Sequence, residues 1–545
     1  MEANRINLYY SPCGCIGISL DETTTADDVE LLIKLFAQAA GAEVPATGDV
    51  DATLPQGLKR ESAFMQQEVF NIYQTETEMM RYMKRLERMD ISLAHSMIPL
   101  GSCTMKLNAA AEMLPLSDIR WCGMHPMAPA SQAKGYLELI KNLGEYLATI
   151  TCMAATSFQP NSGASGEYAG LRTIRSYQES IGQGHRNIVI IPASAHGTNP
   201  ASAAQCGYDI VVVKCDDHGN VDMADLEAKA AQHADNLAAL MITYPSTHGI
   251  FEKEIVRACE IIHAHGGQVY MDGANMNAQV GLTAPGHIGA DVCHLNLHKT
   301  FAIPHGGGGP GVGPICAKEH LVPFLPHHPL LDGSCLDTVS AAPFGSAGIL
   351  AITYGYIRMM GTEGLKRSTE VAILNANYLA SLLNDTYGVL YTGFGGRVGH
   401  ELILQCHDIK VTTGCDETDI AKRLMDFGYH APTLSFPVHG TLMIEPTESE
   451  SKFELDRFAE VMLTIYNECQ EVKEGKADAT DNVLKNSPHP QYEVCADEWN
   501  HAYPRSKAAF PLAWLKDNKF WVNVARVDNA TGDRILIAKI GCDCE

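Results

Sequence analysis

No stretch of this 545-residue sequence approaches the roughly 20 consecutive apolar residues that a transmembrane helix requires, so we expect no membrane span. The first residues lack the apolar core of a secretory signal and the arginine-rich character of a transit peptide, and we expect neither. Basic residues are scarce: 40 lysines and arginines stand against 64 aspartates and glutamates, giving a net charge of −24. This imbalance argues against nucleic acid and anionic membrane surfaces as partners.

The cysteine pattern of a zinc site is also lacking. Cys13 and Cys15, like Cys542 and Cys544, are separated by a single residue, whereas zinc ligands usually have a wider spacing. We interpret these thiols as incidental, the alternative being a redox pair, and we expect no metal. Since no secretory signal is seen, the 17 cysteines are expected to be reduced, which indicates the cytoplasm or a mitochondrial matrix.

Alternating strands and helices dominate the middle of the chain. Apolar residues make up 46% of the sequence and charged residues 19%, enough for the cores of about three or four domains. From Gln159 onward, short runs rich in valine and isoleucine alternate with helical patterns, which predicts a mostly parallel, doubly wound α/β sheet. The predicted strands are Ile188–Ile191, Ile210–Val213, Leu240–Thr243, Val269–Met271 and Val292–Leu297.

We divide the chain into four parts: an N-terminal arm with helices (1–90), a large domain (91–340), a smaller α/β domain (341–480) and a tail (481–545). The tail holds three of the four tryptophans, and this aromatic area predicts that it packs back on the body.

Helix and strand signals also appear outside the large domain. In the arm, Thr25 is the expected N-cap of a helix over Val29–Ala40. A polar, charged stretch over 468–486 predicts a linker. The remaining expected elements are helices over 76–89, 361–384 and 418–427 and strands over 401–406 and 441–445.

Two residues in the large domain suggest cofactor chemistry. Asp272 ends one predicted strand and Lys299 follows another, 27 residues later, before four glycines at 306–309. A lysine in such a place forms a Schiff base with the aldehyde of pyridoxal phosphate (PLP). A carboxylate pairs with the pyridine nitrogen and keeps it protonated, so that the ring acts as an electron sink. Taken singly, such residues are more often solvated surface groups.

Further polar groups lie upstream, each after a predicted strand or before a helix. The segment 161–167 is rich in glycine and serine and precedes a helical stretch, which is typical of a phosphate cradle, although a simple helix cap reads the same way. His196 could stack on a planar ring, or it serves as a structural hydrogen-bonding group. The hydroxyls of Ser246 and Thr247 could bond a phenolic oxygen. The polar loop 98–108 is expected to be a surface turn, the alternative being a substrate-pocket wall.

The order of these features is more informative than any one of them. Cradle, stacking residue, hydroxyl donor, aspartate and lysine occur at successive strand ends in the order found in fold-type I PLP-dependent enzymes, which resemble aspartate aminotransferase. The chain also resembles the C-terminal half of glycine dehydrogenase (decarboxylating), the P-protein family of the glycine cleavage system. The segments that carry this resemblance include GISLDETTT (17–25), IPLGSCTMKLN (98–108), QPNSGASGEYAGL (159–171), SAHGTNPASA (194–203), TYPSTHGIFE (243–252), MDGANMNAQVGL (271–282), HLNLHKTF (294–301), GGGGPGVGPI (306–315) and AAFPLAWLKDNKFW (508–521).

The resemblance implies a reaction and roles for individual residues. Glycine would lose its carboxylate as CO2, and the remaining aminomethyl group would pass to the lipoyl disulfide of the H-protein. Lys299 would be the Schiff-base lysine, Asp272 the partner of the pyridine nitrogen, and His196 the stacking residue. Thr247 would bond the ring oxygen, with Ser246 as a near competitor. The phosphate would be held by Ser162, Gly163, Ala164 and Ser165, with His298 also within reach.

The resemblance also implies partners. The long form of the family is about twice this length, so we expect an N-terminal half or alpha-type subunit as a partner, with the T-protein and L-protein as further members of the system. The C-terminus drifts from the family after Arg534. Two alternatives remain open: another fold-type I decarboxylase or aminotransferase, and a non-catalytic partner half. An intact Lys299 and Asp272 argue against the latter.

Overall fold

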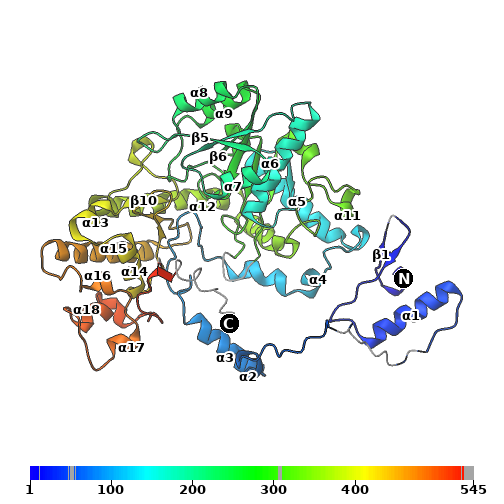
Figure 1. The fold of residues 1–545 in the computed structure, drawn as a ribbon, viewed down its shortest axis with the longest axis horizontal. Coiled ribbons are helices and arrows are strands. Elements are labelled where there is room, and N and C mark those ends of the chain that lie inside the picture. Colours follow the sequence, from blue (N-terminus) through cyan, green and yellow to red (C-terminus); the bar gives the residue numbers. More distant parts are fainter. Residues whose placement is uncertain are drawn as a thin grey trace, which may run out of the picture. The chain divides into compact units, whose positions relative to one another are not determined.

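The computed structural model describes residues 1–11, 13–46, 48, 55, 57–304, 310–529 and 531–532. They form two compact units, the first made of Met1–Arg85 with Ala128–Ala133 and the second of Leu86–Met127 with the chain from Lys134 onward (Figure 1). The glycines at 306–309 and the cysteines at 542 and 544 lie outside the described residues. None of the helices in these ranges is both long enough and apolar enough to cross a lipid bilayer.

The smaller unit contains helix α1 (Ala26–Ala40), which has Thr25 as its N-cap, as predicted, and begins three residues before the expected Val29. Thr25 accepts the backbone N–H of Asp28 at 3.3 Å, and the Asp28 carboxylate accepts the N–H of Thr25 at 2.8 Å, forming a capping box. Gly41, with a φ of 65°, ends the helix in the left-handed conformation that glycine adopts without strain. The other strands and α-helices here are β1 (Tyr9–Tyr10), β2 (Ile16–Gly17), α2 (Val69–Ile72) and all but the last two residues of α3 (Glu76–Glu87).

Seven strands of the larger unit form one sheet: β3 (Ala155–Ser157), β4 (Ile188–Pro192), β5 (Asp209–Val213), β6 (Leu237–Thr243), β7 (Gln268–Gly273), β8 (Val292–Leu295) and β9 (Ile315–Ala317). Their order across the sheet is β3-β9-β8-β7-β6-β4-β5. The neighbours from β8 to β5 are parallel, whereas β9 runs antiparallel to both β8 and β3. The predicted mostly parallel α/β sheet is confirmed.

Helices cover both faces of this sheet, and residues of each strand alternate between two cores. Val269 and Met271 on β7 belong to one core, whereas Tyr270 between them belongs to the other, as the two-residue period of a strand requires. A parallel sheet buried on both faces has uninterrupted apolar strands, which explains the continuous runs in the sequence. The first core contains residues of α5 (Lys134–Thr151), α8 (Met223–Gln232), α9 (Ile255–Ala264) and α12 (Leu350–Tyr387), and the second contains residues of α6 (Gly163–Ser180) and α7 (Thr198–Gln205).

All five strands predicted for this sheet are present, within a few residues of their expected ends. The sequence did not reveal β3 and β9, because three residues are too few for a periodic pattern. The helix expected over 361–384 begins earlier, at Leu350, and bends at Gly361, whose φ is 60°. Since glycine adopts this conformation readily, Gly361 permits a sharp break that other residues would resist.

A second, antiparallel sheet of order β10-β12-β11 lies in the C-terminal part of the larger unit. Its strands are β10 (Leu402–Gln405), β11 (Thr433–Leu434) and β12 (Thr441–Ile444), and helices α12, α14 (Glu417–Asp426) and α15 (Lys452–Lys473) contribute to its core. Trp499, Trp514 and Trp521 pack against the same core. The shorter helices of this unit are α4 (Ile119–Cys122), α10 (Pro285–Ile288), α11 (Pro329–Asp332), α13 (His407–Thr413), α16 (Val483–Asn486), α17 (Gln491–Val494) and α18 (Arg505–Ala509).

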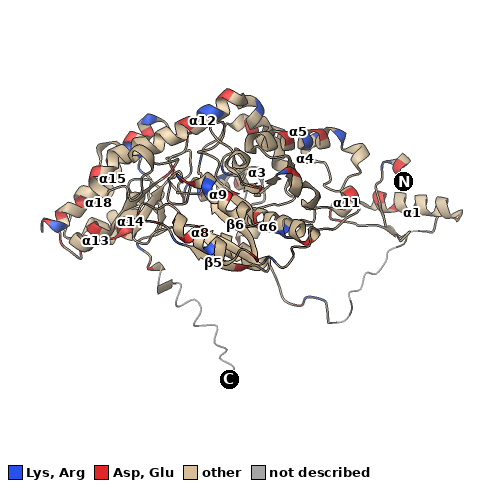
Figure 2. Cartoon of the chain, turned by 90° about the horizontal axis from the view of Figure 1, so that it is seen from above, with Lys and Arg blue, Asp and Glu red and all other residues tan. Residues whose placement is uncertain are grey.

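The linker predicted over 468–486 is wrong at its beginning, because α15 continues to Lys473 and buries Glu468. Both carboxylate oxygens of Glu468 accept hydrogen bonds from the fully buried Arg423, at 2.7 and 2.9 Å. Paired charges can be buried where an isolated charge could not. The polar character of this segment therefore did not mean that its side chains are exposed to solvent. Figure 2 shows that helices α5 and α12 carry residues of both charge signs.

Candidate functional site

A cavity of about 200 Å³ lies where strands β4, β6, β7 and β8 end, the edge at which parallel α/β sheets bind ligands. The residues that line it are far apart in the sequence and range from Ser102 to Lys299. Six residues predicted from the sequence line it: Gly163, Ala164, His196, Thr247, Asp272 and Lys299. Ser162, Ser165, Ser246 and His298 are not among the described residues that line it.

Asp272 is a buried carboxylate that lines the cavity. It sits near the end of β7, directly between Thr243 on β6 and His294 on β8 in the strand register. Its carboxylate accepts the N–H of Ala274 at 3.0 Å and the side-chain amide of Asn199 at 3.1 Å. Burial alone would raise the pKa of Asp272. The neighbouring His294, these two donors and the nearby lysine outweigh that effect, so the pKa lies below the ordinary value and the carboxylate stays ionised.

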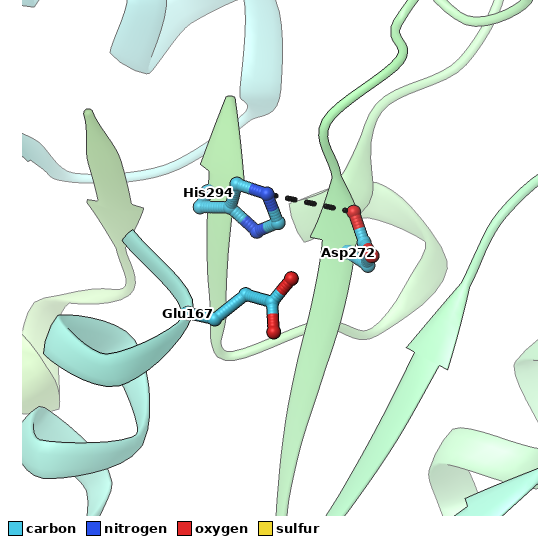
Figure 3. A group of neighbouring side chains, drawn as sticks. All are labelled: Glu167, Asp272 and His294. Atoms are coloured by element: carbon cyan, nitrogen blue, oxygen red, sulfur yellow. Dashed lines mark ion pairs between the residues drawn. The ribbon is translucent and has the colours of Figure 1, made fainter. Parts of the chain in front are cut away.

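Glu167 and His294 complete a buried polar group around Asp272 (Figure 3). His294 Nε2 lies 3.6 Å from Asp272 Oδ1, and its Nδ1 is hydrogen-bonded to the hydroxyl of Tyr270 at 2.6 Å. Glu167 comes from α6 and accepts hydrogen bonds from Thr198 at 2.9 Å and Ser202 at 2.8 Å. The sequence analysis missed both residues. A histidine inside an otherwise apolar strand was the available signal for His294.

The N-terminus of α6 forms one wall. Ser162 is the N-cap residue, and its hydroxyl accepts the N–H of Ser165 at 3.1 Å, so these two residues bond each other. Gly163 and Ala164 follow and line the cavity. A Cβ on Gly163 would lie 2.8 Å from Asn296 Oδ1, so a larger residue here would require the Asn296 side chain to move. Backbone N–H groups and the helix dipole at such an end favour an anion.

The side chains of His196, Thr247 and His298 differ in their burial and in whether they line the cavity. His196 is exposed at its mouth, with Nδ1 2.9 Å from the hydroxyl oxygen of Thr198 and its ring edge-on to Phe436. Thr247 is buried and lines the cavity, whereas the buried hydroxyl of the adjacent Ser246 has no hydrogen-bond partner in the structure. His298 Nδ1 accepts the N–H of Val312 at 3.4 Å, away from the lining.

The loop 98–108 is mostly buried or half-buried and contributes Ser102 to the cavity lining, so the surface turn expected there is wrong, whereas the alternative of a substrate-pocket wall stays a prediction. Ser102 lines the cavity, and its carbonyl oxygen accepts a hydrogen bond from Lys299 Nζ at 2.6 Å. Thr104 is fully buried, and Lys106 Nζ, also buried, donates to the carbonyl of Thr300 at 2.6 Å. The polar residues of the loop are buried because partners from distant segments satisfy them.

The lining suits PLP on structural grounds. Two of its buried polar atoms, Thr243 Oγ1 and Asn296 Oδ1, have no hydrogen-bond partner in the structure, although buried polar groups are normally paired. A lysine amine, an ionised carboxylate and a helix N-terminus open onto the same small space. These groups match the aldehyde, the ring nitrogen and the phosphate of PLP in turn.

Comparison with known families identifies two matching regions. The family "Glycine cleavage system P-protein" matches residues 47–329, and the family "Glycine dehydrogenase, C-terminal domain" matches residues 368–489. The first match alone covers more than half of the 545 residues.

Curated relatives agree with these matches. The glycine dehydrogenase (decarboxylating) of Bacteroides fragilis is 67% identical over 98% of this chain, and that of Christiangramia forsetii is 57% identical over 100% of it. These alignments cover 56% and 57% of the relatives, so the chain spans somewhat more than half of their length.

Solved structures with low sequence identity share the fold. A glycine decarboxylase (P-protein) of the glycine cleavage system, solved in inhibitor-bound form, aligns with a TM-score of 0.62 at 16% identity, covering 82% of this chain and 99% of that one. The glutamate decarboxylase of Lactobacillus brevis aligns with a TM-score of 0.58 at 14% identity, covering 81% and 99%. The fold is therefore that of fold-type I PLP-dependent enzymes, and the chain belongs to the glycine cleavage system P-protein family.

Proposed function

We propose that this chain binds PLP in the cavity through Lys299 and decarboxylates glycine, with transfer of the aminomethyl group to the lipoyl disulfide of an H-protein. The observation that carries this proposal is the shared cavity of Lys299 and a buried, ionised Asp272. PLP, when bound, supplies an electron sink for the bond-breaking step. The relatives named glycine dehydrogenase (decarboxylating) support glycine as the substrate.

Each lining residue then has a task. Asp272 holds a proton on the ring nitrogen, and its low pKa keeps the carboxylate available for that pairing. Gly163 and Ala164, with the dipole of α6, bind the phosphate. His196 stacks on the ring, and Thr247 bonds its oxygen. Ser162 and Ser165 contribute by fixing the helix end, and His298 by accepting the backbone N–H of Val312 in the segment before β9.

The Asp272 carboxylate is itself supported by the group described above. Asn199 and the N–H of Ala274 fix its two oxygens, and Nε2 of His294 lies 3.6 Å from one of them. Because electrostatic stabilisation needs groups that are already oriented, this arrangement favours catalysis as well as binding.

The test has two stages. Apoprotein mixed with PLP should develop the visible absorbance of a lysine-linked cofactor, and borohydride reduction with peptide mapping should place the label on Lys299. A label on another lysine would refute the site. Exchange of labelled bicarbonate into glycine should then require lipoylated H-protein. Exchange without that carrier, or activity on another amino acid, would favour a different fold-type I decarboxylase or an aminotransferase.

A second chain is part of the proposal: an N-terminal half or alpha-type subunit, with the T-protein and L-protein acting on the products. The chain spans 56% of its Bacteroides relative. The smaller unit exposes large apolar side chains, including Leu58 at 72%, Phe64 at 67% and Met80 at 60%. Exposed apolar surface of this kind favours burial against a partner. The compartment we propose is the cytoplasm, where the 17 cysteines would be reduced thiols.

A further inference from the structure

The wall loop beside Lys299 contains two residues in an unusual backbone conformation. Ser102 has a φ of 60° and Thr104 a φ of 52°, both in the left-handed region that residues other than glycine rarely adopt. A branched residue such as Thr104 is especially disfavoured there. Such conformations persist only where surrounding groups hold them, and they gather at functional sites.

Two buried glutamates hold these residues: Glu401, directly before β10, and Glu445, directly after β12. The Glu401 carboxylate accepts the N–H of Ser102 at 2.7 Å and its hydroxyl at 3.1 Å. The Glu445 carboxylate accepts the N–H of Thr104 at 3.0 Å and its hydroxyl at 2.7 Å. Glu401 is 2% exposed and Glu445 is 0% exposed, so neither carboxylate is satisfied by bulk water.

Further buried polar side chains surround the two glutamates. His400, 3% exposed, places Nε2 4.0 Å from an oxygen of each glutamate, and neither of its ring nitrogens has a hydrogen-bond partner in the structure. Asn275, which lines the cavity, donates to both Thr104 and Glu445. The cluster therefore reaches the cavity wall directly.

The contact made by the strained loop is with the reactive lysine. The carbonyl oxygen of Ser102 accepts Lys299 Nζ at 2.6 Å. This contact depends on the direction of the carbonyl, which follows from the left-handed conformation of Ser102. A lysine side chain has many rotamers, so an amine without an acceptor would leave its position readily.

We propose that Glu401 and Glu445 are positioning residues that hold Ser102 and Thr104 so that the Ser102 carbonyl retains the Lys299 amine whenever that amine is not joined to the cofactor. This inference rests on the proposed function, since it assumes that Lys299 joins PLP. The amine then remains inside the cavity, ready to take up the cofactor. The glutamates act through the loop and do not contact the reacting atoms.

A pair of substitutions separates this role from general support of the fold. Glu401→Ala removes the acceptor for Ser102, so the loop relaxes. Ser102→Gly keeps the carbonyl and allows a φ of 60° without strain. In the double variant, glycine should therefore restore part of what Glu401→Ala loses. Glu401→Gln retains an acceptor for the Ser102 N–H and should stay near wild type.

The readout is the rate at which lysine-linked cofactor appears after PLP is added to full-chain apoprotein. We expect Glu401→Ala to slow it about tenfold, the change that ~1.4 kcal/mol produces. Affinity for pyridoxine phosphate, which has an alcohol in place of the aldehyde, should be unchanged. Glu454→Ala is the matched control, because Glu454 is a buried glutamate that accepts the N–H of Met97 upstream of the loop. It should leave the rate unchanged.

The possible results discriminate sharply. Slower linkage with unchanged affinity, rescued by Ser102→Gly, supports the inference. An unchanged rate in Glu401→Ala, or an equal loss in Glu454→Ala, overturns it while leaving the proposed function intact. A double variant as slow as Glu401→Ala also overturns it. Wild-type protein that never forms a lysine linkage overturns the proposed function and this inference with it.

Discussion

Replacing Asp272 by asparagine tests the centre of the proposed site with a change of almost no volume. The two carboxylate oxygens accept from different donors, the N–H of Ala274 at 3.0 Å and the amide of Asn199 at 3.1 Å. An asparagine has one oxygen and one NH2 group, so its NH2 must face one of these donors. The substitution also removes the negative charge 3.6 Å from His294.

Two magnitudes follow from this geometry. A buried donor left without an acceptor costs about 1–3 kcal/mol, so the free energy of unfolding should fall by that amount. A neutral amide does not hold the ring proton, and lost electrostatic stabilisation at a reacting centre costs about 3 kcal/mol, or roughly a hundredfold to a thousandfold in rate. The loss of catalysis should therefore be at least as large as the loss of stability.

The assay measures three quantities on the same preparation: melting temperature, PLP occupancy and glycine decarboxylation with lipoylated H-protein. Asp291→Asn serves as a control, because Asp291 is equally buried and accepts the N–H of Val269, outside the cavity. It should lower the melting temperature and leave turnover of the folded protein unchanged. Near-normal decarboxylation by Asp272→Asn at full PLP occupancy would refute the role given to Asp272.

Three further predictions follow. Lys299→Ala should abolish both turnover and the borohydride-stable label, and a remaining label would show that another lysine binds PLP. Burial raises the pKa of Glu252 to about 7, although the Val221 N–H opposes this, so the folded protein holds its proton more tightly than the unfolded chain. The resulting stability is present below the ordinary pKa near 4.5 and is lost as the pH rises through about 7. In thermal melts, the free energy of unfolding of Glu252→Gln relative to wild type should therefore rise by up to roughly 3 kcal/mol by pH 8. A difference that does not depend on pH would contradict this. The isolated chain should show weak exchange activity that rises, with its melting temperature, when an N-terminal half is added, and full activity alone would exclude the two-half arrangement.

The sequence by itself determined the sheet and the order of its functional residues. Strands buried on both faces must be apolar throughout, so their runs are visible without a structure. Asp272 and Lys299 were predicted because Asp272 directly follows one such run and Lys299 follows another after His298, and the carboxyl ends of parallel strands meet at one edge. The segment carrying Gly163 and Ala164 was visible because a helix N-terminus that binds an anion needs small residues next to it.

The tertiary structure alone decided the surroundings of that site. Ser102 meets Glu401 across 299 residues of sequence, and Thr104 meets Glu445 across 341. The loop 98–108 looked like a surface turn, and 468–486 looked like a linker, because polarity predicts exposure when partners are unknown. Buried polar groups need partners, and those partners came from segments that only folding brings together.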